Sequence, residues 1–209
     1  MLEVTALCCM RGEREVFRDL GFSLAPGRWM HVRGENGAGK TTLLKALTGL
    51  LRPASGSVAW NGRPLHACRE EYHRDLLYLG HANGIKDDLS AAENLAIAGA
   101  IADAPAPGDV AQAMRALGLD PRNTRPVRSL SQGQKRRVAL ARLALGRSKL
   151  WILDEPFAAL DGAAITAVAG LIDRHLDRGG SLVLTSHQDV PLAAQGAQLR
   201  IEPAGVPAP

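Results

Sequence analysis

A glycine-rich segment between a short apolar run and a helical stretch constrains the fold of this chain more than any other feature. Residues 34–41 read GENGAGKT and match the pattern GxxxxGK[ST], after the apolar residues 29–32 and before a helix expected at 41–50. Glycines at these positions let backbone N–H groups approach a ligand closely, and the start of the helix adds the positive end of its dipole. The sequence therefore predicts a loop that cradles phosphate groups.

The side chains of this loop supply the other groups that a bound nucleotide needs. Lys40 offers a cation to the β- and γ-phosphates, and Thr41 offers a hydroxyl ligand to Mg²⁺. A glycine-rich turn without a ligand is the alternative, and the position between strand and helix argues against it. We expect ATP to bind through Gly34, Glu35, Asn36, Gly37, Ala38, Gly39, Lys40, Thr41 and Thr42.

Short apolar runs alternate with longer helical stretches, which is typical of an α/β fold with a parallel sheet. Four runs are expected to be buried strands, at residues 29–32, 76–79, 150–153 and 182–185. The first thirty residues carry turn signals at Arg11-Gly12 and Pro26-Gly27 and predict a small antiparallel sheet. The expected fold is a P-loop NTPase core with a parallel sheet and an N-terminal antiparallel β subdomain.

The middle of the chain is rich in Ala, Leu, Gln and Arg. Apolar residues recur there at helical spacing, at Val110, Met114, Leu117, Val138, Ala141 and Leu145. This pattern predicts an inserted helical lobe at about 85–147, which Pro105 and Pro107 interrupt. We expect one domain at 1–202 and a flexible tail, rich in Pro and Ala, at 203–209.

Composition and charge narrow the function less than the motifs do. The longest apolar-looking stretch, residues 95–102, is less than half of the roughly 20 residues that cross a bilayer, so a cytosolic protein is expected unless a partner tethers it. Only three cysteines are present, and their spacing indicates no disulfide framework or metal pair. The formal charge of +4 suits nucleic acid and anionic lipid equally.

The apolar run at 150–153 ends in two carboxylates, Asp154 and Glu155. Ligands of open α/β sheets bind at the carboxyl ends of the strands, where these two residues are expected. We expect Asp154 to hold Mg²⁺ together with Thr41, and Glu155 to polarise the attacking water. Alone, such a run also fits a strand that leaves the core into a polar loop; the phosphate loop favours the metal site.

The segment Leu130-Ser131-Gln132-Gly133-Gln134 resembles the LSGGQ signature of the ABC ATPases, with Gln132 in place of the first glycine. The resemblance implies the ABC ATPase fold and a homodimer that sandwiches nucleotide. It also implies that Ser131, Gln132, Gly133 and Gln134 face the γ-phosphate of a nucleotide bound to the other copy. A serine that only caps a helix is the alternative, and three motifs in the order of the family argue against it.

Two further positions are similar to functional residues of this family. Asp161 lies in a segment that resembles the D-loop, and His187 resembles the switch histidine, which would contact the γ-phosphate and orient the water held by Glu155. A lone histidine is more often a solvated surface residue, but this one directly follows the last expected strand. The predicted catalytic residues are therefore Glu155, His187 and Lys40.

Two positions depart from the family pattern. His81 stands where the family usually has the glutamine that senses Mg²⁺ and contacts the membrane partner; a neutral imidazole can take the place of that metal contact, so His81 joins Thr41 and Asp154 as a predicted metal residue. Arg11 replaces the aromatic platform for adenine, and its guanidinium can stack on a base. Phe17 is a rival platform, although we expect it to be buried in the sheet.

Several non-catalytic stretches resemble the subgroup of ABC ATPases that serves cytochrome c maturation. They include residues 2–4, 79–86, 150–153 and 186–189. This resemblance implies a haem export system with transmembrane ABC subunits as partners, and a peripheral position on the cytoplasmic face of the bacterial inner membrane. The residues themselves indicate no haem chemistry, because the chain has no CxxCH segment.

Three other functions are open at this point. The chain could energise another small-substrate exporter, or it could be a soluble ABC ATPase that acts on nucleic acid or ribosomes. Proteins of the second kind usually fuse two nucleotide-binding units or insert a long coiled coil, and this chain has neither, so no nucleic acid partner is expected. A non-catalytic scaffold conflicts with the full set of predicted catalytic residues.

Overall fold

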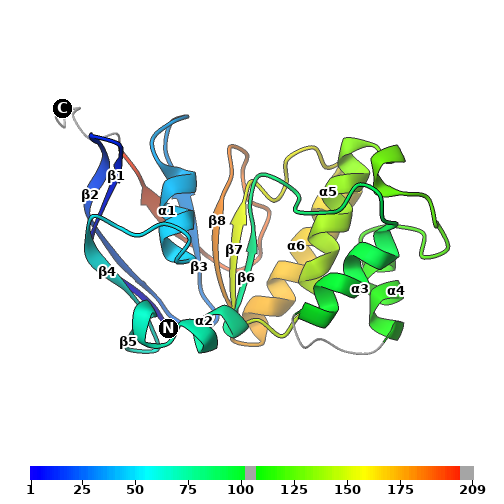
Figure 1. Cartoon of the computed structure of the whole chain (residues 1–209), viewed down its shortest axis with the longest axis horizontal. Helices are drawn as coiled ribbons and strands as arrows, with labels where there is room; N and C mark the ends of the chain where they lie inside the picture. The colour runs from blue at the N-terminus through cyan, green and yellow to red at the C-terminus, as the bar shows by residue number, and fades with distance from the viewer. Residues whose placement is uncertain (102–106, 203–209) are drawn as a thin grey trace.

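The computed structural model describes residues 1–101 and 107–202, and within them two β-sheets lie on either side of one helix (Figure 1). The N-terminal sheet is antiparallel, in the order β2-β1-β4-β5. Its strands are β1 (Leu2–Arg11), β2 (Arg14–Leu24), β4 (Ser55–Trp60) and β5 (Arg63–Pro64). The predicted hairpin is confirmed, because β1 and β2 pair antiparallel and turn between Arg11 and Arg14.

The second sheet is parallel and has the order β6-β7-β8-β3-β9. Its strands are β3 (Trp29–Arg33), β6 (Leu76–Leu79), β7 (Leu150–Asp154), β8 (Ser181–Thr185) and β9 (Ala197–Arg200). All four predicted strands are confirmed. The sequence did not predict β9, since this edge strand reads AQLR, is mostly exposed and has no apolar run.

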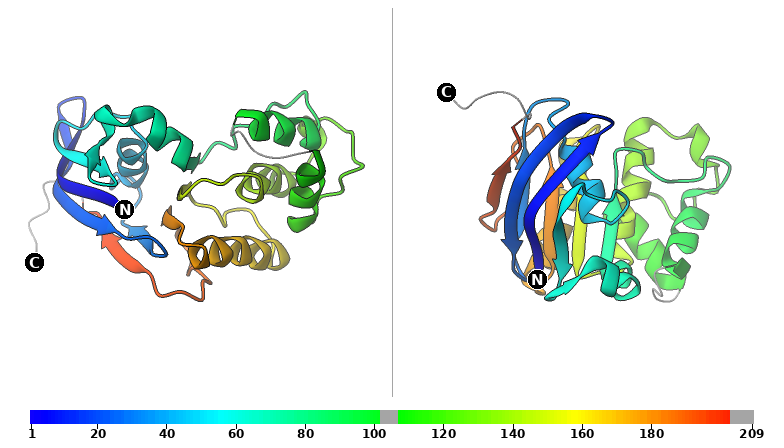
Figure 2. Two further views of the ribbon diagram at one scale, coloured as in Figure 1. Left: turned by 90° about the horizontal axis from the view of Figure 1, so that it is seen from below. Right: turned by 60° about the vertical axis from the view of Figure 1, so that its left-hand side comes forward.

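Helix α1 (Lys40–Leu47) lies between the two sheets, with α2 (Arg69–Asp75) near one end of it (Figures 1 and 2). Leu43, Leu44 and Leu47 are fully buried and join the same core as strands of both sheets. Burying one such side chain stabilises the fold by roughly 1.5–3 kcal/mol. The predicted helix 41–50 was too long, because Gly49 adopts a left-handed backbone (φ +74) that ends it.

The helical lobe stands at the end of the molecule remote from the N-terminal sheet (Figure 2). It contains α3 (Ala91–Ile101), α4 (Pro107–Ala116) and α5 (Gln132–Ala141), with short 3₁₀ turns at Val127–Ser129 and Arg142–Ala144; a third such turn, Leu65–Ala67, precedes α2. The apolar residues predicted to line helices there join a second core under the parallel sheet, together with α6 (Gly162–Asp177).

The predictions about Pro105, Pro107 and the C-terminal tail can be compared with the structure only at Pro107. The predicted interruption of the lobe agrees with the position of Pro107: α3 ends at Ile101, and Pro107 is the first residue of α4, where its fixed φ and missing N–H are tolerated. Pro105 and the predicted tail at 203–209 lie outside the described residues. Across residues 1–101 and 107–202, no helix has the length and apolarity needed to span a bilayer.

Candidate functional site

The glycine-rich loop leaves β3 at its carboxyl end and enters α1. Gly39 precedes the helix with φ +105, and a Cβ atom there would lie 2.3 Å from Cγ1 of Val16. Gly34 also approaches a backbone closely, because a Cβ atom would lie 2.7 Å from the carbonyl oxygen of Ile201. Both positions therefore need glycine for backbone geometry and for space, as expected for a tight phosphate loop.

Lys40 turns back over this loop. Its Nζ donates hydrogen bonds to the carbonyl oxygens of Gly34 (2.7 Å) and Glu35 (3.2 Å). The side chains of Glu35 and Asn36 are exposed at the loop tip, whereas Ala38 is buried beneath it. The ammonium group thus lies at the mouth of the loop, where phosphate oxygens would replace the two carbonyls.

The structure brings Thr41 and Asp154 together across 113 residues of sequence. Thr41 Oγ1 donates to Asp154 Oδ2 at 3.0 Å, and Thr185 Oγ1 donates to Asp154 Oδ1 at 2.7 Å. Asp154 ends β7 and is only 3% exposed. The paired oxygens match the ligands that Mg²⁺ prefers, so the predicted metal pair has suitable chemistry.

Glu155 and His187 also meet, at the carboxyl ends of β7 and β8. The backbone N–H of His187 donates to Glu155 Oε2 at 3.2 Å, and His187 Nε2 lies 3.5 Å from Glu155 Oε1. Glu155 has a left-handed backbone (φ +50), which its N–H stabilises by donating to Thr185 Oγ1 at 3.0 Å. A carboxylate held in a strained conformation beside an imidazole can activate a water molecule.

His31 supports the segment that carries His187. It is buried on β3, and its Nδ1 accepts a hydrogen bond from Arg33 Nε (3.2 Å), so the proton lies on Nε2, which donates to the carbonyl of Ser186 (3.1 Å). Burial lowers the pKa of His31, and the Ser186 carbonyl opposes this shift. The neutral imidazole therefore anchors the backbone next to His187.

The signature segment forms the start of α5. Ser131 and Gln134 make a reciprocal capping box, in which Gln134 N donates to Ser131 Oγ (3.2 Å) and Ser131 N donates to Gln134 Oε1 (3.0 Å). Gln132 is exposed, and a Cβ atom at Gly133 would lie 2.9 Å from the carbonyl oxygen of Ala159. The segment is therefore an open helix N-terminus packed closely on the loop before α6.

Asp161 links this helix to α6 within the same chain. Its Oδ1 accepts from Ala164 N at 2.9 Å, which caps α6, and its Oδ2 forms an ion pair with Arg137 of α5. In Figure 1 the start of α5 and the loop before α1 both lie on the upper side of the molecule, with strands of the parallel sheet between them. The signature segment and the phosphate loop of one chain thus occupy separate parts of one surface.

Comparison with known proteins identifies the family. The family model described as "ABC transporter" matches residues 17–158, more than half of the chain. The chain belongs to the ABC transporter ATPase family. It is thus an ATP-binding, ATP-hydrolysing transporter subunit, and the predicted ABC ATPase fold is confirmed.

Curated relatives of this ABC ATPase share about half of its sequence. It is 51% identical over 193 residues to "Cytochrome c biogenesis ATP-binding export protein CcmA" of Pseudomonas aeruginosa, which covers 92% of this chain and 95% of that protein. The protein of the same name from Escherichia coli (strain K12) is 48% identical over 196 residues, with 92% of each chain covered.

Solved structures agree with this family membership. One described as "Structure of ATP binding subunit of ABC transporter" is 28% identical, covers 90% of this chain and 79% of its own, and has a TM-score of 0.82. Another, "Dimeric Structure of MJ0796, a Bacterial ABC Transporter Cassette", has a TM-score of 0.80 at 21% identity, covering 90% and 88%. The second likeness supports the fold alone.

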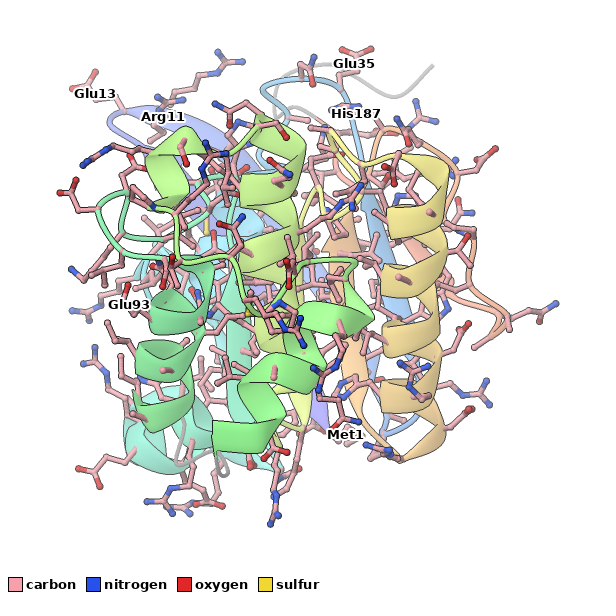
Figure 3. All side chains as sticks on the ribbon, turned by 90° about the vertical axis from the view of Figure 1, so that its right-hand side faces the viewer. Met1, Arg11, Glu13, Glu35, Glu93 and His187 are labelled. Carbon is pink, nitrogen blue, oxygen red and sulfur yellow. The ribbon has the colours of Figure 1, made fainter. Side chains whose placement is uncertain are left out.

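Two predicted residues of this ABC ATPase are not drawn into the site. His81 is exposed after β6, and among residues 1–101 and 107–202 it makes no hydrogen bond or ion pair with Thr41 or Asp154. Arg11 is exposed at the β1–β2 turn, at the same end of the molecule as Glu35 and His187 (Figure 3). Phe17 is buried as expected, so it offers no free platform.

Two residues that organise this end of the sheet were not predicted from the sequence. Thr185 is fully buried and bonds to both Asp154 and Glu155. Arg136 is 6% exposed, and its guanidinium donates hydrogen bonds to the backbone carbonyl oxygens of Asp154 and Glu155. The available signals were weak: Thr185 ends an apolar strand just before His187, and Arg136 is one of three consecutive cations in α5.

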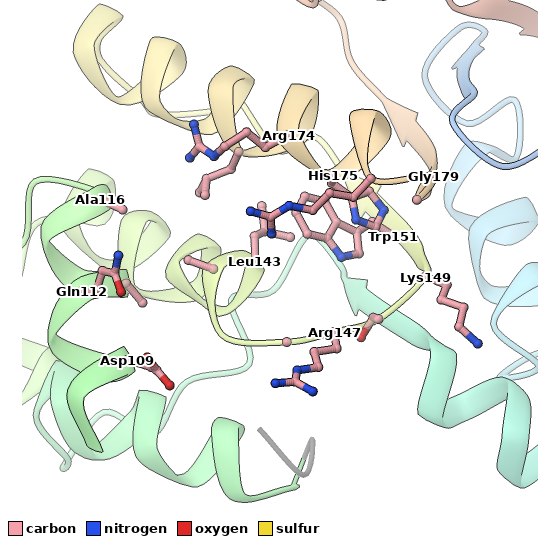
Figure 4. Close-up of a pocket in the computed structure, with 17 residues that line it drawn as sticks. Asp109, Gln112, Ala116, Leu143, Arg147, Lys149, Trp151, Arg174, His175 and Gly179 are labelled. Atoms are coloured by element: carbon pink, nitrogen blue, oxygen red, sulfur yellow. The ribbon is translucent and has the colours of Figure 1, made fainter. Parts of the chain in front are cut away.

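A hollow of about 600 Å³ lies at the opposite edge of the sheet, where β7 and β8 begin (Figure 4). Trp151 and His175 stack there with ring centroids 3.8 Å apart, and His175 Nε2 donates to the carbonyl of Ser181 at 3.1 Å. None of the predicted site residues lines this hollow. It is a junction between the helical lobe and α6, separate from the phosphate loop.

Proposed function

We propose that this chain is the ATPase subunit of an ABC complex for cytochrome c biogenesis, in which ATP drives haem export through transmembrane partners. The observation that carries the proposal is the sequence identity of 48–51% between this chain and export proteins named for that process, over 92% of the chain. The alternative is that the chain energises an exporter of a different small substrate.

Nucleotide binding is proposed at the loop from Gly34 to Thr42. Its backbone N–H groups and Lys40 would hold the phosphates, and Arg11 would stack on the adenine at the same end of the molecule. Thr41 and Asp154 would hold Mg²⁺, since their oxygens already lie 3.0 Å apart. When bound, Mg²⁺ would neutralise charge that develops on the phosphates. His81 stays a prediction, because among the described residues it makes no hydrogen bond or ion pair with Thr41 or Asp154.

Hydrolysis is proposed to depend on Glu155 and His187. Glu155 would orient the attacking water and accept its proton, because its Oε1 is buried and accepts no hydrogen bond from the described residues. His187 would contact the γ-phosphate and keep this carboxylate aligned through the backbone bond of 3.2 Å. Lys40 would balance the negative charge of the leaving phosphates.

A homodimer is proposed to complete each site. The exposed N-terminus of α5, with Ser131, Gln132, Gly133 and Gln134, would cover the γ-phosphate bound by another copy, and Asp161 would lie at the same contact. Membrane partners would place the dimer at the cytoplasmic face of the inner membrane, and no nucleic acid partner is proposed.

The test of hydrolysis is Glu155→Gln, with Glu70→Gln on the exposed face of α2 as a matched control. Phosphate release by the Glu155 variant should fall by about 10²–10⁴-fold, because the proton acceptor is removed. The variant should still bind ATP and form a dimer that is stable in light scattering. Phosphate release at the rate of the control would refute the assignment.

The test of the partner separates membrane from nucleic acid. The tagged chain should be recovered with transmembrane subunits from detergent-solubilised membranes, and it should sediment with those membranes in the presence of competing RNA. Recovery with RNA or ribosomes, and absence from the membrane fraction, would instead favour a soluble ABC ATPase. ATP hydrolysis alone distinguishes neither case.

A further inference from the structure

Arg136 lies where three segments of the chain meet. Its Nη2 donates to the carbonyl oxygens of Asp154 and Glu155, each at 2.8 Å. Its Nη1 donates to the carbonyl oxygen of Gly80 and to Asn83 Oδ1, each at 3.2 Å. One guanidinium therefore joins α5, the end of β7 and the segment that follows β6.

The surroundings of this side chain are unusual for a cation. Burial lowers the pKa of Arg136, and the nearby charges of Asp154 and Glu155 oppose that shift. The guanidinium bonds to backbone carbonyls, although two carboxylates lie close to it. A buried charge is costly unless its donors are paired. Nη1 and Nη2 are paired with four acceptors, whereas Nε has no hydrogen-bond partner among the described residues.

Both carbonyls that Nη2 binds flank the backbone of Glu155. That residue has φ +50, a left-handed conformation that costs a non-glycine residue about 1–2 kcal/mol. Relaxation to an ordinary conformation would turn one of the two peptide groups and break a bond to Arg136. Arg136 thus fixes the conformation that aims the Glu155 carboxylate at His187.

We propose that Arg136 is a positioning residue that couples the segment at 80–83 to Glu155. A displacement of Gly80 or Asn83, or of α5, would move the guanidinium and with it the peptide groups around Glu155. The inference rests on the proposed function, in which α5 meets another copy, and on the family resemblance at His81, which implies that the segment after β6 contacts the membrane partner. It gives both contacts one shared path to the hydrolytic carboxylate.

The test is Arg136→Gln in the full chain, compared with Arg136→Lys. Misplacing a catalytic group by about 1 Å can cost about 100-fold in rate, so kcat of the Gln variant should fall by about that factor. KM and the affinity for a non-hydrolysable ATP analogue should change less than about threefold, because no contact to the phosphate loop is removed. The Lys variant should recover part of kcat, since an ammonium group keeps the charge but cannot span all four acceptors.

Asn83→Ala tests the coupling without touching the buried charge. It removes one bond to Nη1, so kcat should fall several-fold at unchanged KM, and its effect should be absent in the Arg136→Gln background. Because Asn83→Ala retains Arg136, it gives the answer even if Arg136→Gln does not fold. A wild-type kcat in a folded Arg136→Gln variant, or in Asn83→Ala, would overturn the proposal.

Two controls separate this inference from the proposed function. Arg18→Gln makes the same charge change at an exposed side chain of β2 and should leave kcat unchanged. If Glu155→Gln hydrolyses ATP at the wild-type rate, the proposed function fails. If Glu155→Gln is inactive while the Arg136 and Asn83 variants are fully active, only the positioning role fails.

Discussion

Thr185→Val should destabilise the protein although it hardly changes the shape of the side chain. Thr185 is fully buried, accepts a hydrogen bond from Glu155 N (3.0 Å) and donates one to Asp154 Oδ1 (2.7 Å). A bond to a charged group contributes about 1.5–3 kcal/mol, and an orphaned buried donor costs about 1–3 kcal/mol. Valine gains apolar burial that offsets part of this loss, so we expect the free energy of unfolding to fall by about 2–4 kcal/mol.

For a chain of this length, each kcal/mol lowers the melting temperature by roughly 2–4 °C, which gives a decrease of roughly 4–16 °C. Urea unfolding followed by circular dichroism measures the free energy directly. Thr185→Ser keeps the hydroxyl and should lose less stability, and Thr166→Val on the exposed face of α6 should stay within about 0.5 kcal/mol. If Thr185→Val matches Thr166→Val, the two hydrogen bonds do not carry the stability argued for them.

Two further outcomes follow from the described geometry. Gly39→Ala should weaken ATP binding in a titration, since φ +105 is strained for alanine and its Cβ would lie 2.3 Å from Val16 Cγ1. The double variant Gly39→Ala, Val16→Ala removes the clash and should recover only part of the ATP affinity. Full recovery of the affinity would show that the backbone angle is unimportant. Burial lowers the pKa of His31 and of His175. Near and below a pH of about 6.5 the unfolded state therefore binds more protons than the folded state. The free energy of unfolding should consequently fall as the pH drops from 7.5 to 5.5. His175→Gln should flatten that decline, and parallel pH profiles for variant and wild type would contradict it.

The sequence predicted those parts of the fold that depend on local pattern. The apolar runs of the four central strands and the glycines of the phosphate loop act through neighbours in the chain, so their residue types alone indicate what they form. The exposed edge strand β9 has no such pattern, because its pairing with β3 gives it order without burial. The end of α1 is different: a glycine such as Gly49 favours a left-handed helix end, and the predicted range 41–50 ran past that signal.

Residues of the candidate site could be predicted from the sequence where they belong to a motif. Residues that reach the site only through long-range packing could not. Arg136 stands between two other cations, Lys135 and Arg137, and sequence alone does not distinguish the three. Its acceptors come from residues 80, 83, 154 and 155, distant in the sequence on either side of α5. Only the fold brings four acceptors to one of these side chains and thereby buries it.

Ser131 shows how the two interpretations of the signature segment fit together. Its hydroxyl oxygen accepts the cap bond from Gln134 N, but a serine hydroxyl has one donor hydrogen in addition to its acceptor lone pairs. Phosphate oxygens are acceptors, so the donor that capping does not use is the group that a γ-phosphate requires. The cap bond holds the hydroxyl oxygen in place before any dimer contact. Ser131 is also exposed, so another copy of the chain can reach this hydroxyl. The helix cap and the proposed phosphate contact are therefore compatible roles of one side chain.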